Sequence, residues 1–508
     1  MKKMKKVMAL LLSLVMVLAM SVVAFADGNT TGSSAPCTIT VPNNGHQYEI
    51  YQIFTGDYSN GKLSNVKWGA NGIGSEGEAV DEGTINALTA VNTKSEAERL
   101  SEIKKYVKFS STPVEANPNE TYNVTAGYYL IKDKDNTVSG NDAYTLYIVE
   151  VVGNVTITPK SNVPEFSKKI KDTNDTTGDT SPWQDSADYD IGDQVPFQLK
   201  GKVTSRYADY KTYYFAFHDK EEPGLTFNSE SVKVYVDGTQ ITTGYEVTTG
   251  TFEDECTFEV VFKDLKKIKL VKANSEITVE YTSELNNNAV LGKPGNVNKA
   301  KLEFSNNPNS EQTGNPETGE TPWDNVIVFT YQVVVNKYAN SVADGNKLPG
   351  AEFKLEKVLK DGTKTEIAVV KSSDETSFTF KGLDDGDYIL TETKTPAQYN
   401  TIAPIRFTVT ADHQIKWEGE DRNTILKSLS GNAAEGIIEF SKNVESVDKG
   451  NNEIVEIERG LETNVVNKSG STLPSTGGMG TTIFYVVGSI LVLGAAILLI
   501  TKKRMSAR

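Results

Sequence analysis

The strongest constraint on this chain lies at its C-terminus, where an apolar run covers residues 483–500 and is followed by Lys502, Lys503 and Arg504. An uncharged run of this length is about enough to cross a bilayer as a helix, and the basic residues hold the far end in the cytoplasm. We therefore predict a transmembrane helix at 481–501 and a cytoplasmic basic tail at 502–508. Neither segment can belong to a water-soluble core.

A second apolar stretch, residues 7–23, follows four lysines at the N-terminus and ends in Ala24-Phe25-Ala26. Small residues at these positions are what a signal peptidase requires, so residues 1–26 are predicted to be a secretory signal peptide that is cleaved after Ala26. The rest of the chain would then be exported.

A short motif stands just before the C-terminal apolar run: Leu473, Pro474, Ser475, Thr476 and Gly477. The motif, the apolar run and the basic end together resemble the sorting signal of surface proteins of Gram-positive bacteria. The resemblance implies that a sortase cysteine cuts between Thr476 and Gly477 and passes the Thr476 carbonyl to an amine. The mature product would then run from Asp27 to Thr476. The alternative is a plain membrane anchor preceded by a chance Leu-Pro turn.

Composition limits what the mature part can be. Its roughly 450 residues are too many for one core and suggest three domains. The 52 basic against 67 acidic residues argue against nucleic acid as a partner. Two cysteines, Cys37 and Cys256, exclude a disulfide scaffold. The three histidines are not clustered and the Asp-rich turn 384–387 lacks the spacing of a calcium loop, so we expect no metal site and no cofactor.

Alternation of apolar and polar residues dominates the mature part and predicts a mainly β protein. Residues 27–160 also contain a helical patch, so we expect an N-terminal domain with some helix there. Two β-sandwich domains are predicted at 161–325 and 326–470. A loop or interdomain linker is expected at 306–322, and one long strand at 326–337.

Both sandwiches resemble known domains. Leu348-Pro349-Gly350-Ala351-Glu352-Phe353, followed by residues 388–396, resembles the Cna-B-type immunoglobulin-like domain of Gram-positive pilins and adhesins. Phe217-His218-Asp219 with residues 298–308 resembles the second domain of fimbrial backbone subunits. Together with the termini, the likeness covers nearly the whole chain. It implies tandem immunoglobulin-like (Cna-type) β-sandwiches in a sortase-assembled fimbrial (pilus) backbone subunit.

Charged and amide side chains stand where alternation places apolar ones. They form two trios, each with the strand parity of its apolar neighbours: Lys168, Asp219 and Asn298 in the middle domain, and Lys337, Glu392 and Asn467 in the third. Unpaired charge in a core is very costly, so these groups must compensate one another. One alternative for each trio is a buried salt bridge with an Asn hydrogen-bonded beside it.

The second alternative is an amide bond between the Lys amine and the Asn side chain. Burial disfavours the charged form of both Lys and acid, so the amine becomes a neutral nucleophile while the acid stays protonated. The acid would polarise the Asn carbonyl and relay protons as ammonia leaves, without a cofactor. Fimbrial subunits of this family form such isopeptide bonds. The resemblance implies Lys168–Asn298 bonds with Asp219 as the acid, and Lys337–Asn467 bonds with Glu392 as the acid.

A further lysine, Lys160, is predicted to face the solvent rather than a core. In the segment 155–160 alternation places Val155 and Ile157 inside and leaves Lys160 on the polar side, where an outside reagent can reach it. The segment resembles the pilin motif, in which a Lys after a Pro accepts the Thr acyl group of the next subunit. It departs from that motif because Thr158 replaces an aromatic residue or His and no Trp lies upstream. The alternative is an ordinary surface lysine before a linker.

These features predict a structural subunit of a covalently polymerised cell-surface pilus, in which sortase joins Thr476 of one copy to Lys160 of another. The expected partners are a class C-type pilus sortase, a housekeeping sortase, identical subunits and peptidoglycan. One alternative is a monomeric wall-anchored adhesin, which would have a host receptor as partner, and another is an accessory pilin. An enzyme is least favoured, because no nucleophile with its base, carboxylate pair or metal set stands at a readable spacing.

Overall fold

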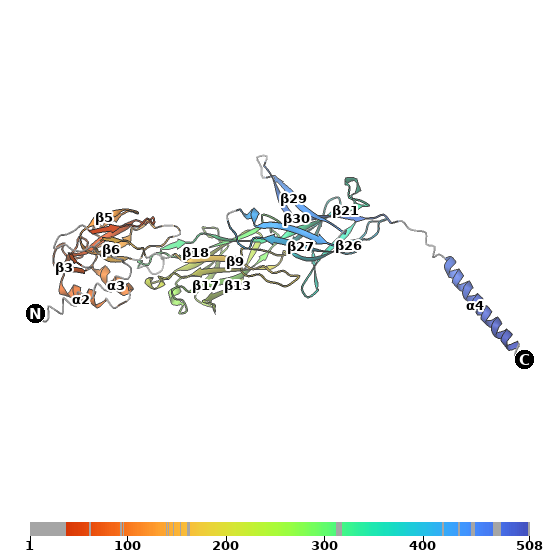
Figure 1. Ribbon diagram of the computed structural model, residues 1–508, viewed down its shortest axis with the longest axis horizontal. Coiled ribbons are helices and arrows are strands. Elements are labelled where there is room, and N and C mark those ends of the chain that lie inside the picture. The colour runs from red at the N-terminus through yellow and green to blue at the C-terminus, as the bar shows by residue number, and fades with distance from the viewer. Residues whose placement is uncertain are drawn as a thin grey trace.

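The computed structural model describes residues 37–505 except 60–61, 92–93, 95, 139, 141, 146, 153, 160–162, 311–316, 419–420, 435–436, 449–452 and 471–478. The predicted signal peptide, Lys160 and the motif 473–477 lie outside the described residues. Three β-rich domains follow one another in a row, and a long helix stands apart beyond the third (Figure 1). The predicted mainly β architecture with a C-terminal helix is confirmed.

The N-terminal domain combines two sheets with two helices. The strand orders are β5-β1-β8 and β3-β2-β6-β7, with β4 beside β2. Helix α2 begins after Asp81, whose Oδ1 accepts a hydrogen bond from the Thr84 amide at 2.9 Å, and Leu88 of this helix is buried in the core. The elements are β1 (Cys37–Thr40), β2 (Tyr48–Ser59), β3 (Lys62–Trp68), α2 (Glu82–Ala90), α3 (Glu96–Ile103), η1 (Lys104–Tyr106), β4 (Val114–Ala116), β5 (Thr121–Val124), β6 (Gly127–Asp133), β7 (Ile148–Val152) and β8 (Asn154–Thr156).

The middle domain is a sandwich with a core rich in aromatic side chains. One sheet has the order β10-β20-β18-β12-β16-β15 with β19 beside β18, and the other has the order β14-β13-β17-β11-β9. The elements are β9 (Glu165–Ile170), β10 (Ser186–Asp188), β11 (Gln194–Lys202), η2 (Tyr207–Asp209), β12 (Phe215–Glu221), β13 (Leu225–Val236), β14 (Thr239–Ile241), β15 (Glu246–Thr249), β16 (Phe258–Phe262), η3 (Leu265–Lys267), β17 (Glu276–Leu285), β18 (Asn296–Ser305), β19 (Thr318–Glu320) and β20 (Asp324–Phe329).

The third domain is a second sandwich, with strand orders β24-β25-β21-β30-β29 and β23-β22-β26-β27-β28. Its first strand, β21, lies parallel to its last, β30, in the middle of one sheet. The elements are β21 (Tyr331–Ala339), η4 (Asp344–Asn346), β22 (Glu352–Val358), β23 (Lys364–Ile367), β24 (Val369–Lys371), β25 (Ser377–Leu383), β26 (Gly386–Lys394), β27 (Ile405–His413), η5 (Arg422–Thr424), β28 (Leu426–Ala433), β29 (Phe440–Asp448) and β30 (Ile454–Asn467).

The single long strand predicted at 326–337 is wrong, because the chain passes from one sandwich to the other within it. Strand β20 belongs to the middle domain and β21 to the third, with the buried Thr330 between them. The Thr330 hydroxyl donates to the Leu383 carbonyl at 3.3 Å, and its own carbonyl accepts from the Gly292 amide at 2.8 Å. Alternate residues of β20 pack into the two different cores, so apolar content alone could not reveal the break.

The segment predicted as a loop or interdomain linker at 306–322 does not connect the second and third domains. It leaves the middle domain after β18 and returns to it through β19, which pairs with β18. On the way it meets the N-terminal domain: the Tyr144 amide donates to the Asn306 carbonyl at 2.7 Å, and Asn309 Nδ2 donates to the Thr145 carbonyl at 2.9 Å. The loop therefore fastens the first two domains together.

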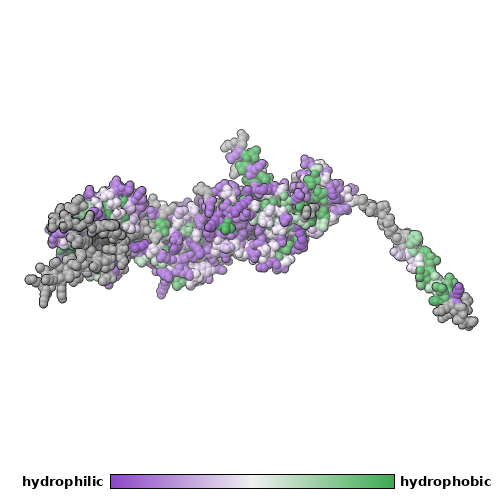
Figure 2. Space-filling model, in the orientation of Figure 1, coloured by the Kyte–Doolittle hydropathy of each residue, from purple (hydrophilic) through white to green (hydrophobic). Residues whose placement is uncertain are grey.

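Helix α4 (Met479–Met505) contains the predicted membrane span. Within it, Phe484–Lys502 is long and apolar enough to cross a bilayer, with a mean hydropathy of 2.5, and none of it is buried against the domains. Figure 2 shows apolar side chains along this helix, whereas the visible surface of the domains is mostly hydrophilic. Such an exposed apolar helix is stable in a membrane rather than in water.

Candidate functional site

The third domain brings its predicted trio together in the core. Lys337 and Asn467 are fully buried and Glu392 is 5 % exposed. Lys337 Nζ donates a hydrogen bond to Asn467 Oδ1 and lies 3.0 Å from Glu392 Oε1. Asn467 Nδ2 donates to both oxygens of Glu392, at 2.9 and 3.0 Å. All three predicted side chains are therefore in mutual contact.

Three strands position this trio. Lys337 comes from β21 and Asn467 from the parallel neighbour β30, while Glu392 comes from β26 in the facing sheet. The Lys337 ammonium also lies 5.1 Å from the centre of the Phe353 ring. Burial lowers the pKa of Lys337, although Glu392 acts in the opposite direction. The site therefore favours the neutral amine more than water does.

The middle domain buries its trio completely, with Lys168, Asp219 and Asn298 all at 0 % exposure. Lys168 Nζ lies 2.5 Å from Asp219 Oδ2. Burial lowers the pKa of Lys168 and raises the pKa of Asp219, and the attraction between the two charges opposes both shifts. Lys168 on β9 and Asn298 on β18 come from opposite sheets. A bond between them would cross the sandwich, whereas the third-domain pair lies within one sheet.

Two further residues complete the middle site, and the sequence analysis did not identify them. The Tyr281 hydroxyl accepts hydrogen bonds from Lys168 Nζ at 2.7 Å and from Asn298 Nδ2 at 2.9 Å, and it donates to Asp219 Oδ2 at 2.7 Å. Glu221 accepts from Asn298 Nδ2 at 3.4 Å. Glu221 has the strand parity of Asp219, so alternation could have identified it; Tyr281 has no such signal, because an aromatic residue in a core is ordinary.

The carboxyl groups differ in position from the sequence-based expectation, in which the acid faces the Asn carbonyl. In the third domain Glu392 faces Asn467 Nδ2, and in the middle domain Glu221 has the corresponding position at Asn298 Nδ2. Burial, with a smaller contribution from Asp219, raises the pKa of Glu221 to about 8. In both sites a carboxyl group therefore contacts the nitrogen that would leave as ammonia.

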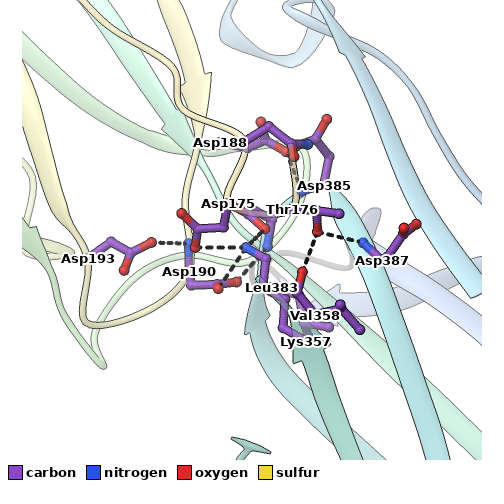
Figure 3. Close-up of polar contacts among 12 residues, drawn as sticks. Asp175, Thr176, Asp188, Asp190, Asp193, Lys357, Val358, Leu383, Asp385 and Asp387 are labelled. Carbon is purple, nitrogen blue, oxygen red and sulfur yellow. Dashed lines mark hydrogen bonds and ion pairs between the residues drawn. The ribbon is translucent and has the colours of Figure 1, made fainter. Parts of the chain in front are cut away.

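Lys357, which is fully buried like Lys168 and Lys337, has a different environment at the contact between the middle and third domains (Figure 3). Its Nζ lies 2.9 Å from Asp190 Oδ2 and 3.2 Å from Asp175 Oδ2, and it also donates to Asp384. Burial opposes its charge, but Asp384 and Asp190 outweigh burial and raise the pKa of Lys357. Nζ thus lies among three carboxylates, so Lys357 forms a charged interdomain salt bridge.

The remaining predicted sites lie outside the described residues, but the segment before Lys160 is described. Ile157 is 3 % exposed, while Thr156 and Thr158 are exposed. The alternation on which the Lys160 prediction depends is therefore present up to Thr158. Strand β8 lies parallel to β1, and the Ile157 amide donates to the Thr40 carbonyl at 2.9 Å, so the end of this domain is held by its first strand.

Three known families match parts of the chain. Residues 191–308 match the Gram-positive pilin backbone subunit 2, Cna-B-like domain; residues 332–423 match a prealbumin-like fold domain; and residues 465–506 match the LPXTG cell wall anchor motif. The first two matches fall on the two sandwiches that contain the trios. The third includes the motif 473–477 and helix α4, and it marks the chain for processing by a sortase.

This chain is also similar to whole proteins. A trypsin-resistant surface T6 protein of Streptococcus pyogenes serotype M6 is 25 % identical over 400 residues, which is 68 % of this chain and 70 % of the relative. Among solved structures, the T6 backbone pilin of that species has a TM-score of 0.47 at 18 % identity and covers 87 % of this chain and 100 % of its own.

The major pilin SpaD of Corynebacterium diphtheriae has a TM-score of 0.46 at 16 % identity and covers 86 % of this chain and 98 % of its own. The matched domains are structural rather than catalytic, and the anchor motif places the chain at the cell surface with a transient membrane anchor. By its domains, this chain carries a Gram-positive pilin backbone domain, a prealbumin-like fold domain and an LPXTG cell wall anchor motif, and it is similar to backbone pilins.

Proposed function

We propose that this chain is the repeating structural subunit of a covalent surface pilus, and that two of its domains each close an internal Lys–Asn amide bond. Sortase would join Thr476 of one copy to Lys160 of another. A class C-type pilus sortase would make these joints, and a housekeeping sortase would attach the finished fibre to peptidoglycan. Repeated head-to-tail joining of this kind is open-ended and produces fibres.

The observation that carries this proposal is the repetition of one buried arrangement in two sandwiches. Lys168 and Lys337 are both fully buried, and burial lowers the pKa of both amines. Each amine shares its pocket with a carboxyl group and the side-chain amide of an Asn. Retaining two charged lysines in two cores would be costly, whereas two neutral amides would not.

The bond-forming step uses only groups that these pockets contain. In the middle domain the neutral Lys168 Nζ attacks Asn298 Cγ and gives up one proton to Asp219. Glu221, protonated because its pKa is raised to about 8, supplies one proton to Asn298 Nδ2. The Cγ–Nδ2 bond breaks, ammonia leaves and an Nζ–Cγ amide remains. The proton gained by Asp219 balances the one lost by Glu221, so the net charge of the pocket is unchanged.

In the third domain one carboxyl group serves both purposes. Glu392 lies 3.0 Å from Lys337 Nζ and 2.9 Å from Asn467 Nδ2, so it can accept a proton from the amine and donate one to the leaving nitrogen. The net reaction is the same, and no oxidant or cofactor takes part. Each bond removes one ammonia, about 17 Da, from the mass of the chain.

The intact mass of the released mature chain tests the internal bonds. We expect a mass about 34 Da below the sequence value, and a branched peptide from each sandwich after proteolysis. The variants Asn298→Ala and Asn467→Ala should each remove one bond and leave the other intact. A mass equal to the sequence value would reduce both trios to buried salt bridges.

The polymer itself is tested by Lys160→Ala in cells that carry the assembling sortases. We expect the high-mass ladder on a denaturing gel to disappear while monomers still reach the cell wall. Lys108→Ala is the matched control, because Lys108 is an exposed lysine of the same domain, and its ladder should persist. A ladder that survives Lys160→Ala refutes that lysine. Absence of any ladder from the unaltered chain would instead indicate a monomeric adhesin or an accessory pilin.

A further inference from the structure

All three histidines of this chain lie beside carboxylates, but they differ in how their ring nitrogens are used. His46 lies 2.7 Å from both Asp133 and Asp142, one at each nitrogen. His218 is 3.0 Å from Asp254 through Nδ1 and 3.1 Å from Glu303 through Nε2. These are ordinary hydrogen-bond distances, and both nitrogens of each ring are occupied by them.

His413 has a different arrangement. Its Nδ1 lies 2.6 Å from Ser186 Oγ, and that hydroxyl donates its own hydrogen to the Gln414 carbonyl. The hydroxyl oxygen must therefore accept from Nδ1–H, which leaves the lone pair on Nε2 in the neutral ring. Metal-binding histidines are oriented in this way, because the nitrogen that does not bind the metal donates to a neighbouring group.

Nε2 faces two carboxylates at a distance suited to an ion. Nε2 lies 3.4 Å from Asp172 Oδ2 and 3.6 Å from Asp188 Oδ1, outside the roughly 2.7–3.2 Å range of an N–H···O bond. The ligand atoms of the three residues all lie within 4.8 Å of one another. Two ligands about 2.1 Å from a tetrahedral zinc ion are about 3.4 Å apart, so these separations leave room for one ion.

These three side chains meet at the contact between two domains. Asp188 ends β10 of the middle domain and Asp172 follows β9, while His413 ends β27 of the third domain. Asp188 and His413 are almost completely buried and Asp172 is 22 % exposed at its side chain. The Asp385 amide also donates to Asp188 Oδ2 at 3.0 Å, which brings a third carboxylate to the same place (Figure 3). Carboxylates therefore outnumber the one imidazole.

We propose that Asp172, Asp188 and His413 form a binding site for one divalent transition-metal ion, for which Zn²⁺ is the matching example, and that the ion joins the middle domain to the third. One imidazole nitrogen and two carboxylate oxygens are a donor set suited to zinc, and a water molecule can fill the fourth position. The sequence analysis expected no metal site because the histidines are not clustered. The fold brings together residues that are more than 200 positions apart, which spacing along the chain cannot show.

A proton is the competing occupant. Burial opposes a charged imidazolium, but Asp172 and Asp188 outweigh burial and raise the pKa of His413 to about 10. Without a metal, Nε2 therefore holds a proton that both carboxylates stabilise. Metal binding exchanges this proton for a doubly charged ion and offsets one more of the surrounding negative charges.

The test is calorimetric titration of Zn²⁺ into the full chain, purified in detergent and stripped with a chelator. We expect one ion per chain. His413→Gln should weaken binding at least about tenfold, and Asp172→Asn should do the same at a more exposed position that is less needed for folding. Ser186→Ala, which removes only the group that orients the ring, should weaken binding by about tenfold.

The other two histidines supply matched controls, because His46→Gln and His218→Gln each remove a histidine beside carboxylates. Both should leave the zinc affinity unchanged, and X-ray absorption of the loaded chain should report one nitrogen and two or more oxygens around zinc. Failure of the unaltered chain to bind Zn²⁺ would overturn the proposal and leave a His–Asp ion pair. Loss of binding in His218→Gln instead of His413→Gln, or a sulfur ligand in the absorption spectrum, would place the ion beside Cys256 and also overturn it.

Discussion

Lys337 and Asn467 project from the same face of two neighbouring parallel strands, two residues out of register: Lys337 pairs with Val465, and Asn467 pairs with Ala339. This diagonal offset brings the Lys337 ammonium into contact with the Asn467 side chain while both backbones keep regular pairing. The positions are 130 residues apart in sequence, yet they lie on the strands by which the chain enters and leaves the third domain. A bond here closes the domain without distorting its sheet.

Replacing Glu392 by Ala should prevent closure of the third domain. No carboxyl group would then move protons between Lys337 and Asn467, so the mass should rise by about 17 Da relative to the unaltered chain, apart from the substitution itself. Loss of a crosslink around a loop of 130 residues should reduce the free energy of unfolding by about 5 kcal/mol. Intact mass and calorimetry measure the two effects. A chain that still lacks the mass of two ammonia molecules would show that Glu392 is not the acid.

Glu221→Gln should slow bond formation in the middle domain by a factor on the order of 100, because Gln cannot supply a proton to Asn298 Nδ2. In the unaltered chain the reaction should slow above pH 8, since Glu221 then loses the proton it must donate. Cell-free synthesis with mass sampled over time measures both rates. The third-domain bond of the same molecule is the internal control and should form at an unchanged rate. A middle-domain rate equal to that of the unaltered chain would show that Glu221 takes no part in the reaction.

Lys357→Met should weaken the contact between the second and third domains. The substitution keeps an unbranched side chain but leaves the carboxylates of Asp190, Asp175 and Asp384 without their shared cation. Breaking such a buried pair costs about 3–5 kcal/mol. Calorimetry of the full chain should show a lower unfolding temperature. Lys364→Met is the matched control at an exposed position of the neighbouring strand β23, and an equally large effect there would contradict the assignment.

Asp193→Asn should change how stability depends on pH. Burial, with a contribution from Asp190 and Asp175 and against that of Lys357, raises the pKa of Asp193 to about 6. The folded chain therefore binds more protons than the unfolded chain between about pH 4 and pH 6, so this group makes the chain less stable as the pH rises through that window. Because Asp193 is partly exposed, the effect should be about 1 kcal/mol.

Asn at this position can still accept the hydrogen bond from the Asp190 amide, so the fold should be retained. Denaturant titrations at pH 4, 5, 6 and 7 should show a flatter pH profile in the variant and greater stability at pH 7. An unchanged profile would mean that Asp193 keeps an ordinary pKa in the folded chain.

Strand alternation predicted the six trio residues because a charged or amide side chain at an apolar position of a strand can be recognised in the sequence itself. The same rule does not report the environment of a side chain. Lys357 follows Phe353 and Leu355 in equal alternation, yet its neighbours are carboxylates, two of them from the middle domain, rather than an Asn. The break at Thr330 was also missed, since β20 is apolar on both faces. Partners that depend on the packing of two domains, such as Asp172 and His413, leave no pattern in the sequence.

The chain segment that leaves β18 and returns to β20 has a mechanical consequence if the subunit is pulled between Lys160 and Thr476. The load would cross the middle domain through Lys168 and Asn298 and the third through Lys337 and Asn467, bypassing the N-terminal domain altogether. Besides the short ends 161–167 and 468–475, residues 299–336 would stay in series without a covalent bypass. Fully extended at about 3.5 Å per residue, residues 299–336 would span up to roughly 130 Å, and they could refold when the tension is released.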